Sequence, residues 1–394
     1  MKTSIAFAAS ILWAVATSLP DATRLPTGAA PGSGMYSLAV DSHERAYLSW
    51  IEPDGAGHAL KFATLDGRQW SAPTTVGRGD RWFVNWADHP SVVPMPDGSL
   101  AAHWLVVNDG GSGDYAYGLR IARSTDRGAT WRQVFADGTD NLHDYSGFVS
   151  LLPAPDGFDA VYLTPPRPLS TDPAEHMMTL RHVSFDSAGK ERSGSVVDGD
   201  TCSCCTTSFV RTSGGLIAAY RDHQPGEIRD ISIVRRVGGR WTPPQTVHRD
   251  GWEINACPTN GPVLAATGAH VAIAWFTAAH DRPVVNVAFS DDAGEHFGAP
   301  TSIAGPSPAG WPAIALLDDG AAAVAWLERT GQGQGELRLR RIGRDGTPGA
   351  TRVVARAPAT RSTGIPQMVR VGDRLLLAWR SDRIESALVP LPAE

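Results

Sequence analysis

The 394-residue sequence has few charged residues, few cysteines and no block of Lys or Arg. Charged residues make up 19 % of the chain, and its net charge is −6. These values argue against nucleic acid, or an anionic membrane surface, as a partner. Beyond the amino terminus no segment is apolar enough to cross a bilayer, which requires roughly 20 apolar residues in succession. The composition therefore predicts no membrane span.

The amino terminus has the pattern of an export signal. Met1-Lys2 precedes an apolar stretch at residues 5–16, and small residues there suit cleavage after Ala16 or Ser18. The stretch is too short for a membrane span, and no cysteine lies beside Ala16 to carry a lipid. We therefore predict that residues 1–18 are a signal peptide, and that the protein is exported to the periplasm or secreted.

Turn-forming residues are plentiful, with 41 Gly and 29 Pro, as a fold of many short strands requires. Apolar and small residues alternate with period two, and no comparable pattern recurs at helical spacing. Seven times, a pair of strands around a Gly- or Asp-bearing turn ends on an aromatic residue. These residues are Trp50, Trp104, Tyr162, Tyr220, Trp275, Trp326 and Trp379. A repeat of short strands every 50 to 60 residues or so predicts a closed ring of small sheets.

The predicted fold is all-β, a single β-propeller over residues 35–394. Seven four-stranded blades are favoured, and six are the alternative. We expect the first strands of the blades at residues 36–40, 91–94, 148–152, 208–211, 262–265, 312–316 and 366–371. The last repeat has no clear fourth strand. Residues 19–34 are predicted to be a linker or to supply that strand, which would close the ring and remove exposed sheet edges.

Two turns share the pattern Ser-x-Asp-x-Gly-x-x-aromatic, at residues 124–131 and 290–297. Their Ser and Asp side chains can bind the backbone amides of the turn, so we predict a structural role. The turns resemble the Asp-box repeats of the sialidase superfamily. The segment at residues 202–277 is also similar to bacterial secreted proteins known as sialidase-like. The resemblance implies a sialidase-like β-propeller and, as one function, an exo-α-sialidase-type glycoside hydrolase acting on sialylated or related acidic glycans.

The resemblance also implies a site with three arginines, a Tyr nucleophile activated by Glu, and an Asp as acid and base. The arginine that such families carry in their first blade is missing from residues 33–40, which counts against cleavage of sialic acid. Short turns occupy one face of the propeller, so the longer loops that face the other side are where a ligand is expected. Candidates on that face are Arg221, Arg282, Arg329 and Arg380 as clamp, Tyr220 or Tyr145 as nucleophile, Glu227 as its base, and Asp222 or Asp230 as acid. His223 and Asn260 are further ligand-binding candidates.

The only cysteines, Cys202, Cys204, Cys205 and Cys257, precede the first strands of the fourth and fifth repeats. Equivalent points of adjacent blades lie close together, so we expect the four sulfurs to converge. Two disulfides would suit an oxidising compartment. A site of three or four thiolates would suit Cu(I) or Zn(II), with His143 or His223 completing the ligand set if one thiol points away. A hybrid with one disulfide and two free thiols is the third possibility.

Three functions remain open at this point. The favoured one is a metal- or ligand-binding envelope protein centred on the cysteines. The second is the glycoside hydrolase implied by the resemblance. The third is a disulfide-stapled scaffold whose loop face binds a protein partner. The expected ligands are accordingly a metal, a small molecule or a glycan.

Overall fold

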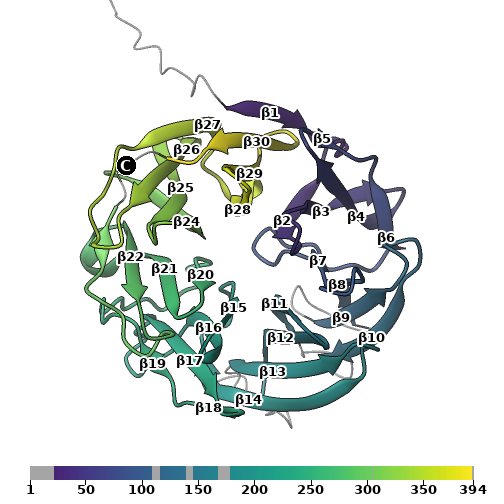
Figure 1. Ribbon diagram of the computed structural model, residues 1–394, viewed down its shortest axis with the longest axis horizontal. Coiled ribbons are helices and arrows are strands. Elements are labelled where there is room, and N and C mark those ends of the chain that lie inside the picture. Colours follow the sequence, from purple (N-terminus) through teal and green to yellow (C-terminus); the bar gives the residue numbers. More distant parts are fainter. Residues whose placement is uncertain (1–21, 109–115, 139–144, 167–177, 304, 393–394) are drawn as a thin grey trace, which may run out of the picture.

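The structure, a computed structural model, describes residues 22–392 except 109–115, 139–144, 167–177 and 304. Seven antiparallel sheets stand around a central axis as the blades of a propeller (Figure 1). This confirms the predicted all-β propeller and the choice of seven blades over six. Within the described ranges helix is limited to two single turns, η2 (Ala279–Asp281) and η3 (Arg361–Thr363). Neither has the length or hydropathy of a membrane span. The predicted signal peptide, residues 1–18, lies outside the described residues.

The first three blades follow one another along the chain. Blade 1 contains β2 (Gly34–Val40), β3 (Ala46–Asp54) and β4 (Gly57–Asp66), with β5 (Gln69–Trp70) and β6 (Thr74–Gly79) both paired to β4. Blade 2 contains β7 (Ser91–Pro94), β8 (Leu100–Val107), β9 (Tyr117–Ser124) and β10 (Arg132–Asp137). Blade 3 contains β11 (Gly147–Ala154), β12 (Gly157–Thr164), β13 (Met178–Asp186) and β14 (Glu191–Thr201).

The other four blades complete the ring. Blade 4 contains β15 (Ser208–Thr212), β16 (Gly215–Arg221) and β17 (Ile231–Val237), with β18 (Arg240–Trp241) and β19 (Gln245–Thr246) paired to β17. Blade 5 contains β20 (Val263–Thr267), β21 (His270–Thr277), β22 (Val284–Ser290) and β23 (Thr301–Ser302). Blade 6 contains β24 (Pro308–Leu316), β25 (Ala322–Gly331), β26 (Gln334–Ile342) and β27 (Arg352–Pro358). Blade 7 contains β28 (Gln367–Val371), β29 (Arg374–Arg380), β30 (Ile384–Pro390) and β1 (Thr23–Pro26).

Blade 7 joins the two ends of the chain. Strand β1 pairs antiparallel with β30, with Leu25 opposite Ser386 (Figure 1). Leu25 is buried, and the Ser386 hydroxyl donates a hydrogen bond of 2.9 Å to its carbonyl oxygen. The guanidinium of Arg24 lies over the ring of Trp379. The segment before Met35 therefore supplies the fourth strand that the last repeat lacks.

The second strand of each blade forms much of the core. It carries at least one alanine followed within four residues by an aromatic side chain, and Trp50, Trp275, Trp326 and Trp379 are fully buried. The small residues allow neighbouring blades to approach each other: Ala219 of blade 4 packs in one cluster with Trp275 of blade 5. Fully burying such a ring contributes about 3 kcal/mol. The small and aromatic residues that repeat in the sequence are thus the residues that pack neighbouring blades against each other.

The Ser-x-Asp turns make the hydrogen bonds expected of them. In blade 2, Ser124 Oγ accepts from the Gly128 amide at 2.7 Å, and Asp126 Oδ1 accepts from the Thr130 amide at 2.9 Å. The corresponding turn of blade 5 repeats both bonds. Gly128 has φ of 90°, and a Cβ there would lie 2.6 Å from the ring of Phe62 in blade 1. These turns therefore have a structural role.

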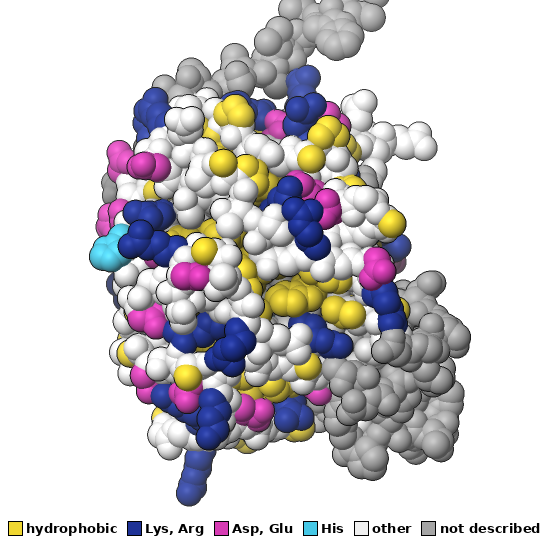
Figure 2. All heavy atoms as spheres, turned by 90° about the vertical axis from the view of Figure 1, so that its right-hand side faces the viewer, with side chains coloured by type: hydrophobic (Ala, Val, Ile, Leu, Met, Phe, Trp, Pro, Cys, Tyr) yellow, Lys and Arg dark blue, Asp and Glu magenta, His cyan; other side chains and the backbone are white. Residues whose placement is uncertain are grey.

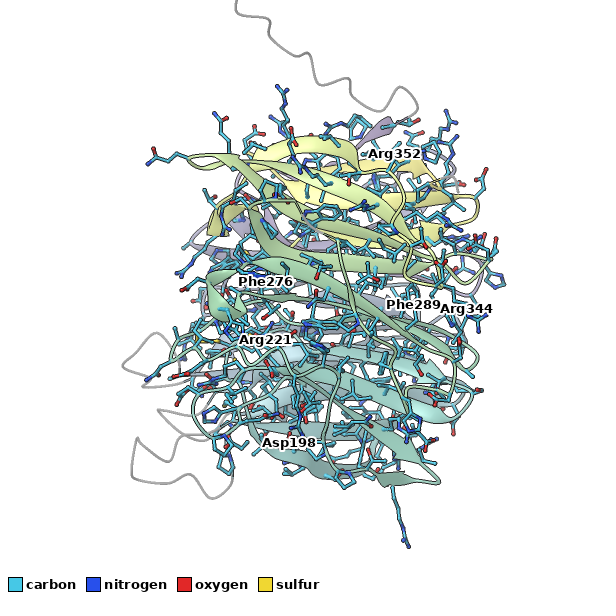
Figure 3. All side chains as sticks on the ribbon, turned by 90° about the vertical axis from the view of Figure 1, so that its left-hand side faces the viewer. Asp198, Arg221, Phe276, Phe289, Arg344 and Arg352 are labelled. Atoms are coloured by element: carbon cyan, nitrogen blue, oxygen red, sulfur yellow. A yellow bond between two sulfur atoms is a disulfide. The ribbon has the colours of Figure 1, made fainter. Side chains whose placement is uncertain are left out.

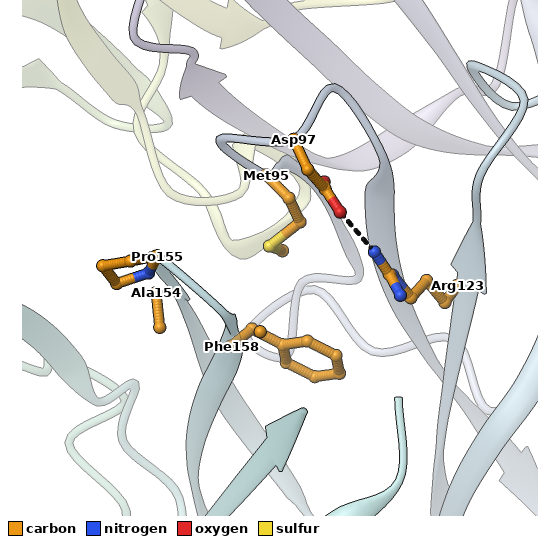
Figure 4. Close-up of a pocket in the computed structure, with 7 residues that line it drawn as sticks. Met95, Asp97, Arg123, Ala154, Pro155 and Phe158 are labelled. Carbon is orange, nitrogen blue, oxygen red and sulfur yellow. Dashed lines mark hydrogen bonds and ion pairs between the residues drawn. The ribbon is translucent and has the colours of Figure 1, made fainter. Parts of the chain in front are cut away.

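The face of the propeller that carries the short turns, here called the turn face, offers little space for a ligand between blades 2 and 3. Met95, Arg123 and Phe158 surround a gap of about 10 Å³, closed by a 2.7 Å ion pair between Arg123 and Asp97 (Figure 4). Such a volume holds at most one water molecule.

On the side of the propeller seen in Figure 2, basic and acidic side chains stand interspersed.

Candidate functional site

The four cysteines meet on the loop face, where the chain passes between blades 3, 4 and 5. Cys202, Cys204 and Cys205 lie in the connection from β14 to β15, and Cys257 lies in the connection that leads to β20. Cys204 and Cys257 form a disulfide with their Cα atoms 5.8 Å apart. Cys202 and Cys205 are free and buried. The expected convergence is confirmed, and of the three possibilities the structure shows the hybrid.

The two free thiols face the disulfide at short range. The Sγ atom of Cys202 lies 3.5 Å from that of Cys205 and 3.9 Å from that of Cys204. All three sulfurs lie within 4.8 Å of one another. Two thiolates on one tetrahedral zinc ion are about 3.8 Å apart, given Zn–S bonds of about 2.3 Å. The Cys202–Cys205 and Cys202–Cys204 sulfur distances lie close to that value.

The surroundings of the free thiols favour one thiolate. The hydrogen bond from Cys205 lowers the pKa of Cys202, as do the Cys204 amide and the charges of Arg221 and Arg229. Burial raises the pKa of Cys205, and the neighbouring Cys202 raises it further. The pair therefore shares one negative charge more readily than two.

Arg221 is buried beside the cysteines rather than exposed at the channel mouth, where a carboxylate clamp would need it. Its guanidinium donates to the carbonyl oxygen of Asn260 at 2.7 and 2.9 Å, to that of Phe276 at 2.7 Å, and to that of Arg229. Its side chain also covers the ring of Trp252, 4.7 Å from the centroid. Figure 3 shows Arg221 and Phe276 on the same side of the propeller, away from Phe289 and Arg344. Its N–H groups are thus taken up by the protein, which corrects the clamp prediction.

Asp222 and Asp230, the candidate acids, brace the loop between β16 and β17. Asp222 accepts from the Ser232 hydroxyl at 2.7 Å and from the amide of the next residue at 2.8 Å. Asp230 accepts from the amides of Gly251 and Trp252 at 2.9 and 3.0 Å. Both carboxylates are buried. This geometry supports the loop and leaves neither carboxylate facing a substrate.

The candidate nucleophiles have other partners than Glu227. The phenol of Tyr220 donates to the carboxylate of Asp198, and burial raises its pKa, as does that carboxylate. A phenol with a raised pKa is a poorer nucleophile. Tyr145 lies in the connection between blades 2 and 3, with its ring centroid 5.7 Å from that of Tyr117. The predicted Tyr–Glu pair is therefore not assembled.

A polar chain runs along the edge of the cysteine cluster. His223 Nδ1 lies 2.7 Å from Asp200 Oδ1, and its Nε2 lies 3.6 Å from Glu227 Oε1. The guanidinium of Arg229 donates to Glu227 Oε2 at 2.6 Å, which lowers the pKa of that carboxyl. The sequence placed His223 and Glu227 on this face. Its site prediction missed Asp200, because its partner His223 lies on a separate connection, and it missed Arg229, although Arg229 is only two residues from Glu227. His143, the other histidine considered for a metal, lies outside the described residues.

The other clamp candidates lie on separate blades. Arg282 is exposed after η2 in blade 5, and Arg329 of blade 6 is exposed and donates to the carbonyl oxygen of Pro308 at 2.9 Å. Arg380 at the end of β29 donates to the carbonyl oxygen of Ser33 at 2.7 Å. The four candidate arginines thus come from four different blades, and Arg221, Arg329 and Arg380 each donate to backbone oxygens of the protein. No contact among the described residues gathers three of them into one clamp.

Asn260 also serves the scaffold. Its side-chain oxygen accepts from the Trp311 amide at 2.7 Å, which ties the start of blade 5 to blade 6. Its backbone oxygen accepts twice from Arg221. Asn260 thus links three blades instead of facing a ligand.

A cavity of about 330 Å³ lies on the propeller axis, lined by residues from all seven blades. Asp88 is the carboxyl group of its lining, and burial raises the pKa of this group to about 7, although it accepts a 2.9 Å bond from the Phe148 amide. His89 is held between the carbonyl oxygens of Tyr36 and Trp86 at 2.9 and 2.8 Å. No Lys or Arg is among the described residues that line the cavity. The ionisable side chains of the described lining are thus Asp88 and His89.

Comparison with known proteins identifies the fold and no family. No protein-family model and no curated protein matches the chain. A protein of unknown function from Dyadobacter fermentans has 13 % identity over 95 % of this chain and 98 % of its own, with a TM-score of 0.51. The α-L-arabinofuranosidase of Fusarium graminearum has 11 % identity over 94 % and 98 %, with a TM-score of 0.53. An ulvan lyase has 12 % identity over 93 % and 96 %, with a TM-score of 0.58. At these identities the likeness is one of fold alone.

Proposed function

We propose that this protein is an exported β-propeller that binds Cu(I) or Zn(II) through the thiolates of Cys202, Cys204 and Cys205. The observation that carries the proposal is the grouping of three sulfur atoms within 4.8 Å of one another. Thiolates are the ligands that these soft ions prefer. Export is supported by the pattern of the amino terminus.

The charge of the surroundings supports a thiolate site. Arg221 is buried, and the hydrogen bonds of its guanidinium go to backbone carbonyl oxygens instead of to a carboxylate. An uncompensated buried cation is unfavourable. A cluster of three thiolates with one bound Cu(I) or Zn(II) has a net negative charge. This negative charge would compensate the positive charge of the buried Arg221 guanidinium.

Metal titration of the reduced protein under anaerobic conditions tests the proposal. We expect one ion per chain, in competition with a chromophoric chelator. Cys202→Ser and Cys205→Ser should each weaken binding by more than about 100-fold, because loss of even an outer partner of a ligand weakens binding roughly 10–100-fold. Ser203→Ala, between the ligands in sequence, is the matched control and should bind as wild type does. Failure of reduced wild type to bind either ion would leave the cysteines as a structural staple.

A second candidate, a glycan-binding or glycan-acting protein, is favoured by the axial cavity. Its volume of about 330 Å³ and its many hydroxyl groups suit a sugar. Two proteins of similar fold are named for glycans, the arabinofuranosidase and the ulvan lyase. The lack of Lys and Arg in the described lining favours neutral sugars over sialic acid. Calorimetric titration with neutral and acidic sugars, and a fluorogenic sialoside assay, would distinguish these ligands; we expect no turnover of sialosides.

A further inference from the structure

The four cysteines differ in their exposure to solvent. Cys257 is exposed, its disulfide partner Cys204 is half-buried, and Cys202 and Cys205 are buried. Cys204 is also one of the three sulfurs that face each other. The same sulfur therefore belongs to a disulfide and to the group that would hold a metal.

We propose that Cys257 is the position at which an external dithiol reductant attacks, and that reduction of the Cys204–Cys257 disulfide completes the three-thiolate metal site. A sulfur in a disulfide has no thiolate to give to a metal. The oxidised protein therefore has two metal ligands, Cys202 and Cys205, and the reduced protein has three. This inference rests on the proposed metal function.

The reduction is a balanced exchange of two electrons. A thiolate of the reductant attacks Sγ of Cys257 and forms a mixed disulfide, and Cys204 leaves as a thiolate. The second thiol of the reductant then attacks its own sulfur in the mixed disulfide. Cys257 is released as a thiol, and the reductant leaves as a disulfide. Each released thiolate is protonated or, in the case of Cys204, binds the metal.

Two features of the site make Cys257 the sulfur that is attacked. Attack requires access along the S–S bond, and Cys257 is the more exposed residue of this disulfide, since Cys204 is half-buried. The leaving thiolate forms on Cys204, whose Sγ lies 3.9 Å from that of Cys202, so the Cys202 thiol can donate a hydrogen bond to the departing sulfur. Access and hydrogen bonding thus point in the same direction.

The first test uses wild-type protein in two redox states. Thiol titration should count two thiols in the oxidised protein and four after treatment with dithiothreitol. Zn(II) competition titration should show more than about 100-fold tighter binding by the reduced protein, as for loss of any ligand. Treatment of the oxidised protein with glutathione, followed by peptide mass mapping, should place the mixed disulfide on Cys257.

Two variants separate this inference from the metal function. Cys257→Ser leaves Cys204 free and should bind Zn(II) as tightly as reduced wild type, with or without dithiothreitol. Cys204→Ser has no third ligand and should bind weakly in both conditions. Tryptophan fluorescence checks that each protein is folded, and the wild-type comparison stands without the variants.

The possible results have different meanings. Equal binding by oxidised and reduced wild type would overturn the gating by the disulfide while the metal function stands. Absence of binding in every state would overturn the metal function and, with it, the gate. A glutathione adduct on Cys204 would overturn the assignment of Cys257 as the attacked sulfur.

Discussion

Replacing Arg221 tests whether this residue is part of the scaffold or of a ligand clamp. Arg221→Met keeps much of the volume of the side chain and removes the guanidinium. Three carbonyl oxygens, those of Asn260, Phe276 and Arg229, then lose a donor. Each buried acceptor left unpaired costs about 1–3 kcal/mol, and the lost contact with the Trp252 ring adds about 1 kcal/mol. Because the guanidinium no longer has to be desolvated, we expect a net loss of about 3–5 kcal/mol.

Urea unfolding followed by tryptophan fluorescence measures this loss as a decrease in the midpoint. The expected change is a large part of the stability of a typical domain, about 5–15 kcal/mol. Arg282→Met, at an exposed position, is the matched control and should change stability by less than about 0.5 kcal/mol. An Arg221→Met protein as stable as wild type would refute the reasoning. If that protein had also lost binding of an acidic sugar, the clamp would be restored as the role of this residue.

Three further predictions concern the axis, the closure and the turns. In the folded protein Asp88 keeps its proton up to about pH 7, whereas the unfolded chain releases it near pH 4. The free energy of unfolding should therefore decrease as the pH rises from about 4 to about 7, and Asp88→Asn should remove this pH dependence. A pH series of urea midpoints measures the slope. Leu25→Asp places a charge in the buried closing strand and should cost about 3 kcal/mol, with faster hydrogen exchange in β30 than in β16. Asp292→Ala removes the acceptor of the His296 amide and should lower stability by about 1 kcal/mol without changing Zn(II) affinity.

The architecture was predictable because each blade repeats one local pattern. A strand of small residues followed by an aromatic side chain has to pack against the next blade. Because this pattern occurs seven times, the sequence predicts seven blades. Strand β7 begins and ends where the sequence predicted. Strand β24 begins at Pro308, before the predicted residue 312, because the chain bulges there. Trp311 has a φ of 52° in this bulge, a backbone conformation that no composition rule indicates for Trp.

The roles of individual side chains at strand ends were not predictable. The sequence places Arg221 directly after Tyr220, and alternation alone would point it away from the core. In the structure the β14–β15 connection pairs with this strand end, and the Cys202 amide donates to the Arg221 carbonyl oxygen at 3.1 Å. Arg221 instead enters the space between blades 4 and 5. That pairing joins distant segments, so no local pattern in the sequence reports it.

The arrangement of the cysteines was unpredictable for the same reason, because it depends on contacts between segments that are distant in the sequence. The position of the cysteines in the repeat predicted that Cys257 lies near the Cys202–Cys205 segment. It left two disulfides, a thiolate metal site and a hybrid as possible arrangements. Which sulfur pairs with Cys257 depends on the path of two connections to within a few ångströms. The structure pairs the half-buried Cys204 with the exposed Cys257 and leaves the two buried thiols free. Sequence reasoning could therefore predict the cluster and not its bonding.

The disulfide is not the only link between blades 4 and 5, and this bears on the redox proposal. Arg221, at the end of β16, holds the carbonyl oxygens of Asn260 and Phe276 in blade 5. Apolar side chains of the two blades also pack in one cluster. Reduction of Cys204–Cys257 removes one covalent bond between connections and leaves these contacts in place. Because these contacts remain, the reduced protein should stay folded. Its three thiolates should then lie in the positions seen here, where they can bind a metal ion.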